Sequence, residues 1–400
     1  MQAILCERKD CIGCFACLQS CKQKAISIEN SDDGFLYPVI NHAKCVNCGV
    51  CSRSCPIISL NPPYKYNHES PCYSAYHKDV GVRMKSSSGG LFYTLATNVI
   101  EKGGCVYGAG WMDDMVLRHQ KAEDKDSLMK LMRSKYVQSD TSEVYQDVRE
   151  ELKSGREILF SGTPCQVAAL KSFLGNKEYP QLLTVDVICQ GVPSPVIFRK
   201  YLDAQEEKYG SKVVDVVFRT KEKGWRCGLL LLLLLLADGR EIELKYKKND
   251  YYHAFLKNYF LRESCYSCQF KQCNKGCFSD ITLADFWRIG TVVPFKCESY
   301  DKGVSAVLTN TEKGKKSFDE IKEFLVWEHR TFGEFSTNGG LSIASCPPRQ
   351  KEATKAAMNR GMDEVQSEYF PYTWRAYLSD LLNMHLSYKT IQNIKKWTRK

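Results

Sequence analysis

The sequence predicts a protein of the α+β and α/β classes, with a small cysteine-rich domain, a mixed α/β domain and a mainly helical C-terminal extension. Two regularly spaced cysteine runs lie within residues 1–62 and indicate the small domain. Short apolar runs then alternate with amphipathic stretches, which is typical of an α/β domain. We expect this second domain to span residues 72–350 and the helical extension to span residues 351–400.

The two cysteine runs share the spacing C-x2-C-x2-C-x3-C, and Pro56 completes the second copy. Their members are Cys11, Cys14, Cys17, Cys21, Cys45, Cys48, Cys51 and Cys55. Two matching copies indicate a bacterial ferredoxin-type domain with two [4Fe-4S] clusters, in preference to a zinc or disulfide framework. In such domains the last cysteine of each run binds the cluster of the other run. We therefore expect Cys55 to join the first cluster and Cys21 the second, and we expect Cys6, outside the pattern, to be a free thiol.

The composition is that of a soluble globular protein, with 44% hydrophobic and 26% charged residues. The N-terminus has no basic segment followed by a long apolar stretch, so we expect no signal peptide. The longest apolar run, Leu229–Leu236, is too short for a membrane span of about 20 residues, and we interpret it as a buried strand. Twenty cysteines in such a chain favour metal binding over disulfides, and they favour a cytoplasmic protein.

The net charge of +10 is not concentrated in one block, and no motif supports nucleic-acid binding. Basic residues gather around Lys221–Lys248 and in the C-terminal "YKTIQNIKKWTRK". These patches are either solvated surface or docking sites, for an acidic partner such as a small ferredoxin or for a phosphorylated cofactor.

The second domain begins after the linker "LNPPYKYNHESP". Strands are predicted in "GCVYGAGW" (104–111), "REILF" (156–160) and "LLTVDVIC" (182–189). Helices are predicted within residues 86–104, 141–155, 166–174 and 190–210, several of them ending at glycine. Residues 212–240 are compatible with an antiparallel hairpin whose turn is "ADGR", and residues 301–324 with a strand and helix pair.

Two turns in this domain place small residues at the start of a predicted helix. They are "SSSGG" (86–90) and "SGTPCQ" (161–166). Free N–H groups and the helix dipole favour phosphate or another anion at such a position. Serine and threonine are also ordinary helix caps, so each turn taken alone supports both interpretations.

Six motifs occur in a fixed order: "KSSSGGLFYTLA", "SKYVQSD", "LFSGTPCQVAALK", "DVICQGVPSP", "SCYSCQF" and "SDITLADFW". With them the chain resembles the beta subunits of coenzyme F420-reducing hydrogenase and F420-dependent dehydrogenases, fused to an N-terminal two-cluster ferredoxin domain. The resemblance covers residues 1–350. It implies a flavoprotein that carries FAD beside an iron–sulfur cluster.

The motif match also implies which residues bind the flavin. They are Ser86, Ser88, Gly89, Gly90, Tyr136, Gln138, Gly162, Thr163 and Gln166. No general acid or base is evident. His253 is a candidate for such a role, and Asp280 and Asp285 in "SDITLADFW" for contact with the cofactor, but for all three we favour structural roles.

A third cysteine group is found in "CYSCQFKQCNKGC" (265–277). Cys165 and Cys189 each follow a predicted strand, and the carboxyl ends of parallel strands meet at one sheet edge. The family pattern implies that Cys165, Cys189, Cys265 and Cys268 hold a third [4Fe-4S] cluster next to the flavin. Two alternatives stay open: a site made wholly by the loop, including Cys273 and Cys277, or no third metal.

These features together predict an FAD-dependent iron–sulfur oxidoreductase. It would pass electrons between its [4Fe-4S] clusters and, through FAD, a two-electron substrate, either coenzyme F420 or another small organic molecule. Ferredoxin or another redox protein is the expected partner. The alternative is an electron-transfer subunit of a larger redox complex without its own substrate site, and a weaker one is an iron–sulfur protein that has lost its flavin.

Overall fold

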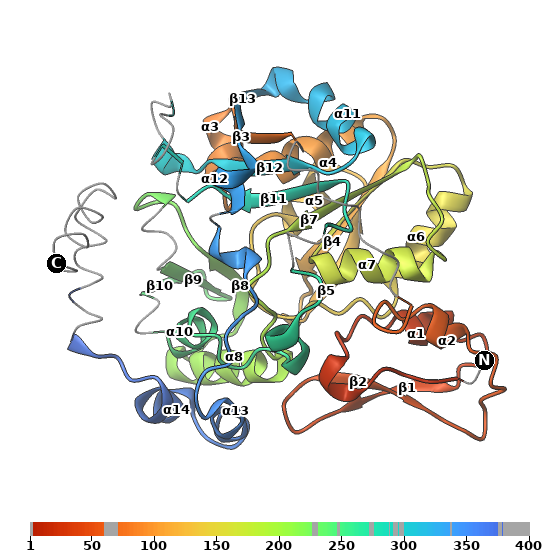
Figure 1. Ribbon diagram of the computed structural model, residues 1–400. Helices are drawn as coiled ribbons and strands as arrows, with labels where there is room; N and C mark the ends of the chain where they lie inside the picture. The colour runs from red at the N-terminus through yellow and green to blue at the C-terminus, as the bar shows by residue number, and fades with distance from the viewer. Residues whose placement is uncertain are drawn as a thin grey trace.

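A computed structural model describes residues 3–59, 71–225, 231–245, 249–271, 276–287, 289–290, 295, 300–336, 338–374 and 378 (Figure 1). It shows the predicted mixed α/β architecture, with a small N-terminal part beside a large mixed sheet and its helices. The linker from residue 60 to 70, Leu229, Leu230, Cys273 and most of the segment after residue 374 lie outside the described residues. None of the helices in the described ranges is long and apolar enough to span a membrane.

The N-terminal part consists of a hairpin and short helical turns that carry the cysteine runs. Strands β1 (Ile26–Asn30) and β2 (Leu36–Ile40) pair antiparallel. The turns are η1 (Arg8–Asp10), α1 (Ala16–Ser20) and α2 (Val50–Arg53). Gly49 precedes α2 with a left-handed φ of 68°, a conformation that glycine adopts without a steric penalty.

The large sheet has eight strands in the order β13-β3-β12-β11-β7-β6-β4-β5. Their bounds are β3 (Cys72–His77), β4 (Cys105–Trp111), β5 (Leu117–Ala122), β6 (Ile158–Gly162), β7 (Leu182–Val187), β11 (Ile281–Asp285), β12 (Ser305–Thr309) and β13 (Leu325–Arg330). The central strands β4, β6, β7 and β11 run parallel, and the outer pairings are antiparallel. The carboxyl ends of β6 and β7 therefore lie next to each other.

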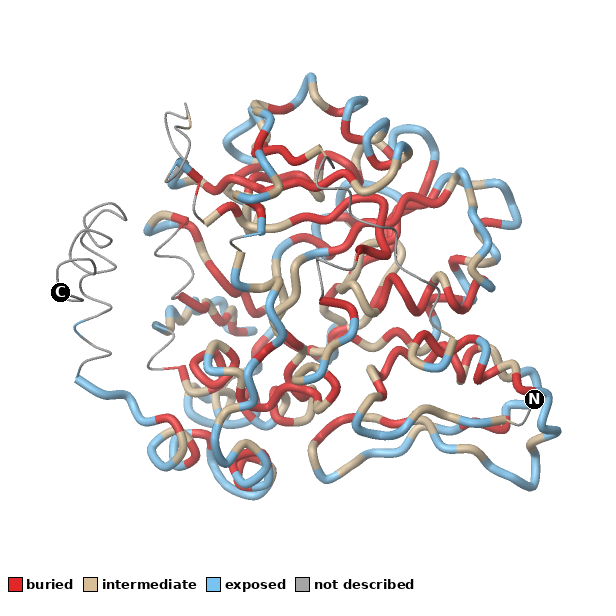
Figure 2. The backbone as a smooth tube through the Cα atoms, viewed as in Figure 1, coloured by how far each residue is buried: buried red, intermediate tan, exposed pale blue. Residues whose placement is uncertain are grey.

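Helices cover both faces of this sheet, so its central strands are buried (Figure 2). On one face α4 (Leu91–Glu101), α5 (Lys125–Leu131) and α11 (Glu312–Glu320) pack against the sheet. On the other face lie α6 (Val144–Lys153) and α7 (Pro164–Phe173). Leu159 faces the first layer, whereas its neighbours Ile158 and Phe160 face the second, as the two-residue period of a strand requires.

A second apolar core forms around a smaller sheet of three antiparallel strands, in the order β10-β9-β8. These are β8 (Val213–Phe218), β9 (Leu231–Leu236) and β10 (Glu241–Lys245), and the turn that joins β9 to β10 is the predicted "ADGR". Helices α8 (Pro195–Tyr209), α10 (Asp250–Leu256), α13 (Gln350–Asn359) and α14 (Met362–Tyr369) contribute to the same core. The described part of the predicted helical extension therefore packs on the middle of the chain.

The remaining elements are short. They are α3 (Val80–Met84), η3 (Glu263–Ser267), η5 (Tyr300–Lys302), η6 (Lys322–Phe324), α12 (Phe332–Ser336) and η7 (Gly339–Leu341). Of these, η3 bears on the site because it carries Cys265 and lies against η1 of the N-terminal part.

Candidate functional site

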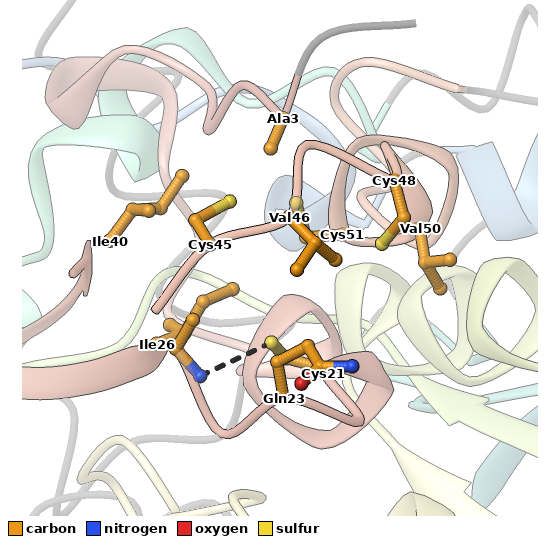
Figure 3. A pocket seen from close by; sticks show the side chains of 11 residues that line it. Ala3, Cys21, Gln23, Ile26, Ile40, Cys45, Val46, Cys48, Val50 and Cys51 are labelled. Carbon is orange, nitrogen blue, oxygen red and sulfur yellow. Dashed lines mark hydrogen bonds between the residues drawn. The ribbon is translucent and has the colours of Figure 1, made fainter. Parts of the chain in front are cut away.

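One cavity of the N-terminal part is lined by four cysteines from both runs. Cys21 comes from the first run, and Cys45, Cys48 and Cys51 come from the second (Figure 3). The Ala25 N–H donates a hydrogen bond to the Cys21 sulfur at 3.4 Å, a contact that stabilises a thiolate. This is the crossed set that the spacing predicts for the second cluster, and four sulfur donors around one cavity suit a [4Fe-4S] group.

The other four cysteines, Cys11, Cys14, Cys17 and Cys55, are all buried. Burial, together with the neighbouring thiols of Cys11 and Cys55, raises the pKa of Cys17 to about 12. Burial also raises the pKa of Cys14, and Cys17, Cys55 and Cys11 add to that effect. The four thiols therefore form one group, which is the crossed set predicted for the first cluster.

Cys6 lies directly beside this first group. A hydrogen bond with the Cys6 side chain lowers the pKa of Cys11 to about 6 and that of Cys55 to about 7. The sequence pattern gave no reason to place Cys6 here, because its spacing from Cys11 matches no ligand rule. A lower pKa at Cys11 and Cys55 favours the thiolate form in which cysteine binds iron.

The third cysteine set converges at the carboxyl edge of the large sheet. Cys165 lies in the first turn of α7, directly after β6, and Cys189 lies two residues beyond β7. Cys265 lies in η3, and Cys268 is the residue that ends it. Burial raises the pKa of Cys165 well above its usual value, and the thiols of Cys268, Cys189 and Cys265 raise it further. Four sulfurs from three chain segments thus lie within electrostatic reach of one another.

The other residues of this third set show the same effect. Burial and the Cys265 thiol raise the pKa of Cys189 to about 12, and burial raises that of Cys265 to about 11. In the described ranges, no three histidine, cysteine or carboxylate side chains are spaced to share a single metal ion. A [4Fe-4S] cluster has iron at four corners, so its sulfur ligands stand further apart than those of one ion. The alternative loop site would include Cys273 and Cys277. Cys273 lies outside the described residues, and the Cys277 sulfur donates to the Ser279 carbonyl at 3.7 Å.

Arg262 connects the first and third cysteine groups. Its side chain is 1% exposed, and its Nε donates to the Cys11 carbonyl at 2.7 Å. Its Nη2 donates to the Leu36 carbonyl at 2.9 Å, and the guanidinium lies 4.3 Å from the centre of the Tyr37 ring. Ser264, in η3, also donates to the Cys11 carbonyl. The turn that carries Cys265 is therefore attached to the loop that carries Cys11.

Gln138, a predicted flavin residue, takes part in the same connection. Its Oε1 accepts from Arg262 Nη1 at 2.8 Å, and its Nε2 donates to the Ile12 carbonyl at 2.9 Å. Close packing at Gly13 leaves no room for a side chain, since a Cβ would lie 2.6 Å from the Arg262 guanidinium. Both polar atoms of Gln138 are thus engaged in holding the N-terminal part.

The predicted serine and glycine turn lies between α3 and α4, against the ends of β3 and β12. The Gly89 N–H donates to Ser305 Oγ at 2.9 Å, and Ser88 Oγ donates to the Val304 carbonyl at 2.9 Å. Ser86 Oγ donates to the Val82 carbonyl at 2.8 Å, and Gly90 precedes α4 with a φ of 96°. These hydrogen bonds to other parts of the protein hold the turn in place.

We predict that Gly89→Ala destabilises the protein. An added Cβ would lie 2.8 Å from the Ser305 nitrogen and closer still to the Ala75 carbonyl oxygen, both backbone atoms that cannot rotate away. The free energy of unfolding should fall by about 1–3 kcal/mol, as measured by chemical denaturation. In the control Gly339→Ala, no atom lies within 4 Å of the new Cβ, and a change as large as that of Gly89→Ala would contradict the steric explanation.

The second predicted turn caps α7 through a polar network. Gln166 Oε1 accepts from the Thr163 N–H at 2.9 Å, and Gln166 Nε2 donates to Ser139 Oγ at 2.9 Å. Ser139 Oγ lies 3.0 Å from His119 Nδ1, and burial lowers the pKa of His119 to about 4. Gly162 packs closely against Gln166, since a Cβ added at Gly162 would lie 3.1 Å from Gln166 Oε1. Thr163 Oγ1 also lies 3.1 Å from the Cys165 sulfur. These contacts support the interpretation of this turn as a helix cap.

A buried ionic group lies under the serine turn. Arg219 donates to both carboxylate oxygens of Asp285, at 2.6 and 2.9 Å, and to the Ser87 carbonyl at 3.2 Å. Lys221 Nζ donates to three carbonyl oxygens, those of Arg83, Ser88 and Lys302. Burial lowers the pKa of Lys221 to about 7. The sequence assigned Lys221 only to a basic patch and did not single out Arg219.

Two polar atoms of this ionic group have no partner among the described residues, namely Arg219 Nε and Thr220 Oγ1. The Trp225 and Trp287 rings stack beside it, with centroids 4.4 Å apart, and the Arg219 guanidinium lies 5.0 Å from the Trp287 ring. Tyr136, another predicted flavin residue, accepts from Arg219 Nη1 at 3.4 Å. The unsatisfied Arg219 Nε and Thr220 hydroxyl, next to flat aromatic rings, suit a planar cofactor that carries polar groups.

The residues considered for acid–base roles make structural contacts. His253 Nδ1 lies 3.0 Å from Gln366 Nε2, and its ring packs against Phe370 in α14's C-terminal cap. Asp280 accepts from the Thr184 N–H and hydroxyl and from Thr311 Oγ1. Asp285, as described, pairs with Arg219. These contacts agree with the structural roles expected for all three residues.

The fold and the ferredoxin-type cysteine runs define the class of protein, which is an iron–sulfur redox protein. A family model for a 4Fe-4S dicluster domain matches residues 10–57. Residues 155–332 match the family described as the C terminus of the coenzyme F420 hydrogenase/dehydrogenase beta subunit. The chain therefore joins a region that matches a 4Fe-4S dicluster domain to a region that matches this beta-subunit family, and the predicted resemblance is confirmed.

Among solved structures, the chain is similar to one chain of the F420-reducing [NiFe] hydrogenase complex from Methanosarcina barkeri. The two are 16% identical, the match covers 76% of this chain and 93% of that chain, and the TM-score is 0.45. At these values the likeness carries no conclusion about activity. No curated protein sequence matches the chain.

Proposed function

We propose that the protein is an FAD-dependent iron–sulfur oxidoreductase. It exchanges a hydride with a small organic substrate, which is coenzyme F420 or another two-electron carrier, and it passes single electrons to or from a redox protein such as ferredoxin. The observation that carries this proposal is the convergence of Cys165, Cys189, Cys265 and Cys268 at the sheet edge, tied through Arg262 to Cys11. This arrangement supports one continuous series of iron–sulfur sites.

The roles of the chain's own residues follow from their positions. The third cysteine set would hold a [4Fe-4S] cluster, and the first and second crossed sets would hold the two ferredoxin clusters. Arg219, whose Nε has no partner among the described residues, would bind the anionic part of FAD beside the serine turn. Lys221 donates to three backbone carbonyls and would hold that turn in place. When bound, FAD supplies the exchange between hydride and single electrons. Trp225 and Trp287 would exclude water from that side.

The predicted flavin residues fall into three groups under this proposal, apart from Ser86, whose hydroxyl donates to the Val82 carbonyl. Ser88 and Tyr136 accept from Lys221 and Arg219, and Gly89 and Gly90 follow Ser88 in the same turn. These four residues remain proposed flavin contacts. Gly162, Thr163 and Gln166 lie beside Cys165 at the start of α7. Gln138 is occupied by Arg262 and Ile12, so we propose for it a role in domain contact.

The second candidate is an electron-transfer subunit whose substrate site lies in another protein. It is favoured by the internal hydrogen bonds of Gln138, Gln166 and Ser86, which engage three predicted flavin residues within the protein itself. Anaerobic reconstitution of the full chain with iron, sulfide and FAD separates the two candidates. The enzyme should retain FAD through gel filtration and reduce a viologen dye with reduced F420 or NAD(P)H. Retained iron without flavin or substrate-linked reduction would favour the second candidate.

A further inference from the structure

The two ferredoxin-type sites differ in how they face solvent. The cysteines of the first crossed set are at most 9% exposed, and their loops contact the large domain through Gln19, Thr141 and Arg262. In the second set Cys48 is exposed, and Cys21 and Cys45 are half-buried. The cavity of Figure 3 is therefore the part of the N-terminal iron–sulfur region that an external molecule can approach.

Exposed apolar side chains are found at this cavity. Val46, which lines it, is 62% exposed, and Ile4, next to the lining residue Ala3, is 54% exposed. Ile4 is held close by, because its backbone exchanges two hydrogen bonds with the Ser52 hydroxyl. Exposed apolar residues that gather at one place mark a contact surface more often than isolated ones do.

Three basic residues adjoin residues that line the same cavity, and we call them its rim. Lys22 follows Cys21, Lys44 precedes Cys45, and both side chains are exposed. Arg53, two residues after Cys51, is also exposed and donates to the Cys48 carbonyl at 3.4 Å. None of these three cations forms an ion pair with a residue in the described part of the chain. The rim therefore carries positive charge that is not neutralised locally.

Two acidic residues of the N-terminal part, Asp32 and Asp33, lie at the opposite end of its hairpin from the cavity. Ile26 and Ile40, which pair at the near end, line the cavity. Asp32 and Asp33 lie in the far turn, where the neighbouring Gly34 carbonyl accepts from Ser194 of the large domain. The Asp32 and Asp33 carboxylates are thus remote from the cavity, and Asp33 pairs with Arg8.

We propose that the cavity rim formed by Lys22, Lys44, Arg53 and Val46 is the docking surface for an acidic, one-electron redox protein of the ferredoxin class. This inference rests on the proposed function, since it requires the second crossed set to hold its cluster. Charge complementarity selects the acidic partner, and the apolar centre at Val46 suits a small interface from which water is excluded. One electron passes between the partner and this chain, so that one is oxidised as the other is reduced. No bond forms and no proton moves.

The test is a charge reversal in the iron-loaded full chain, with an acidic two-[4Fe-4S] ferredoxin as the probe. The triple variant Lys22→Glu, Lys44→Glu, Arg53→Glu should weaken ferredoxin binding, measured by calorimetry, on the order of tenfold or more. It should also flatten the dependence of the binding constant on salt. The matched control reverses three exposed cations of the large domain, Lys200, Lys316 and Lys355, so its net charge changes equally.

The outcomes distinguish this inference from the proposed function. Iron content and dye reduction by small viologens should stay unchanged in both triple variants, because a small dye needs no docking surface. If the control weakens binding as much as the rim variant, or if the rim variant binds ferredoxin normally, the docking surface is wrong. The same holds if the wild-type chain binds only anionic vesicles or a second copy of itself. A wild-type chain that binds ferredoxin but lacks flavin would overturn the proposed enzyme and leave the docking surface standing.

Discussion

Cys165→Ser should lower the iron content of the anaerobically reconstituted chain from about 12 to about 8 atoms per chain. Cys165 is half-buried and lies within electrostatic reach of the thiols of Cys189, Cys265 and Cys268, so its loss removes one of four ligands from the third set. Serine has nearly the same size, and the fold should survive the change. Iron and acid-labile sulfide analysis, with the circular dichroism spectrum as a check on folding, measures the result.

Two further variants make this prediction specific. Cys189→Ser should cause the same loss, because Cys189 lies at the neighbouring strand end and belongs to the same set. Cys277→Ser should keep all the iron, since the Cys277 sulfur interacts with the Ser279 carbonyl and belongs to the alternative loop site. If Cys277→Ser loses iron while Cys165→Ser keeps all of it, the third cluster is bound by the loop and not by the set that contains Cys165.

Arg262→Met should destabilise the protein by about 3 kcal/mol or more, since several buried acceptors lose their donor together. The carbonyls of Cys11 and Leu36 and the amide oxygen of Gln138 all accept from this one guanidinium. Methionine fills much of the same volume but donates no hydrogen bond. The shift appears as a lower thermal unfolding midpoint of the iron-loaded chain and as earlier proteolysis between the N-terminal part and the large domain.

The control for Arg262 is Arg360→Met. Arg360 forms an exposed ion pair with Glu368 at 2.8 Å, and pairs of that kind contribute little to stability. Arg262→Lys should recover part of the lost stability, because an ammonium group reaches fewer of the three acceptors. Equal midpoints for Arg262→Met and the wild type would show that the connection between the first and third cysteine groups does not depend on this residue.

Much of the iron–sulfur region was predictable because its rule is local. A spacing of two and three residues fixes which thiols share a loop, and the crossed ligation places Cys21 with the second run. The structure brings that set around one cavity. Cys189 and Cys165 were also predictable as neighbours, since parallel strands β6 and β7 are adjacent in the chain and in the sheet.

Long-range features were not predictable in the same way. Strand β11 is inserted between β7 and β12, almost a hundred residues after β7, and no local pattern indicates that position. Arg262 belongs to no recognised motif, although it donates a hydrogen bond to the carbonyl of Cys11, which is 251 residues away in the sequence. Arg219 has a left-handed φ of 64°, which propensity disfavours for such a residue. Its pairing with Asp285 is a property of the fold.

The leucine run shows a third limit. Leu232 and Leu234 are buried in the second core, whereas Leu233 and Leu235 face the other side of β9 and are only half-buried. A strand is normally recognised by alternation between apolar and polar residues. Uniform leucine hides that alternation, so the sequence predicted a strand here but not which face it buries.

The central claim is that a third cluster and a flavin share one chain with the two ferredoxin clusters. Spin-quantified electron paramagnetic resonance of the reduced, reconstituted full chain, combined with flavin extraction from the same sample, tests it most directly. We expect about three reduced [4Fe-4S] clusters and about one FAD per chain. Two clusters and no FAD, in a sample whose fold is intact, would contradict it.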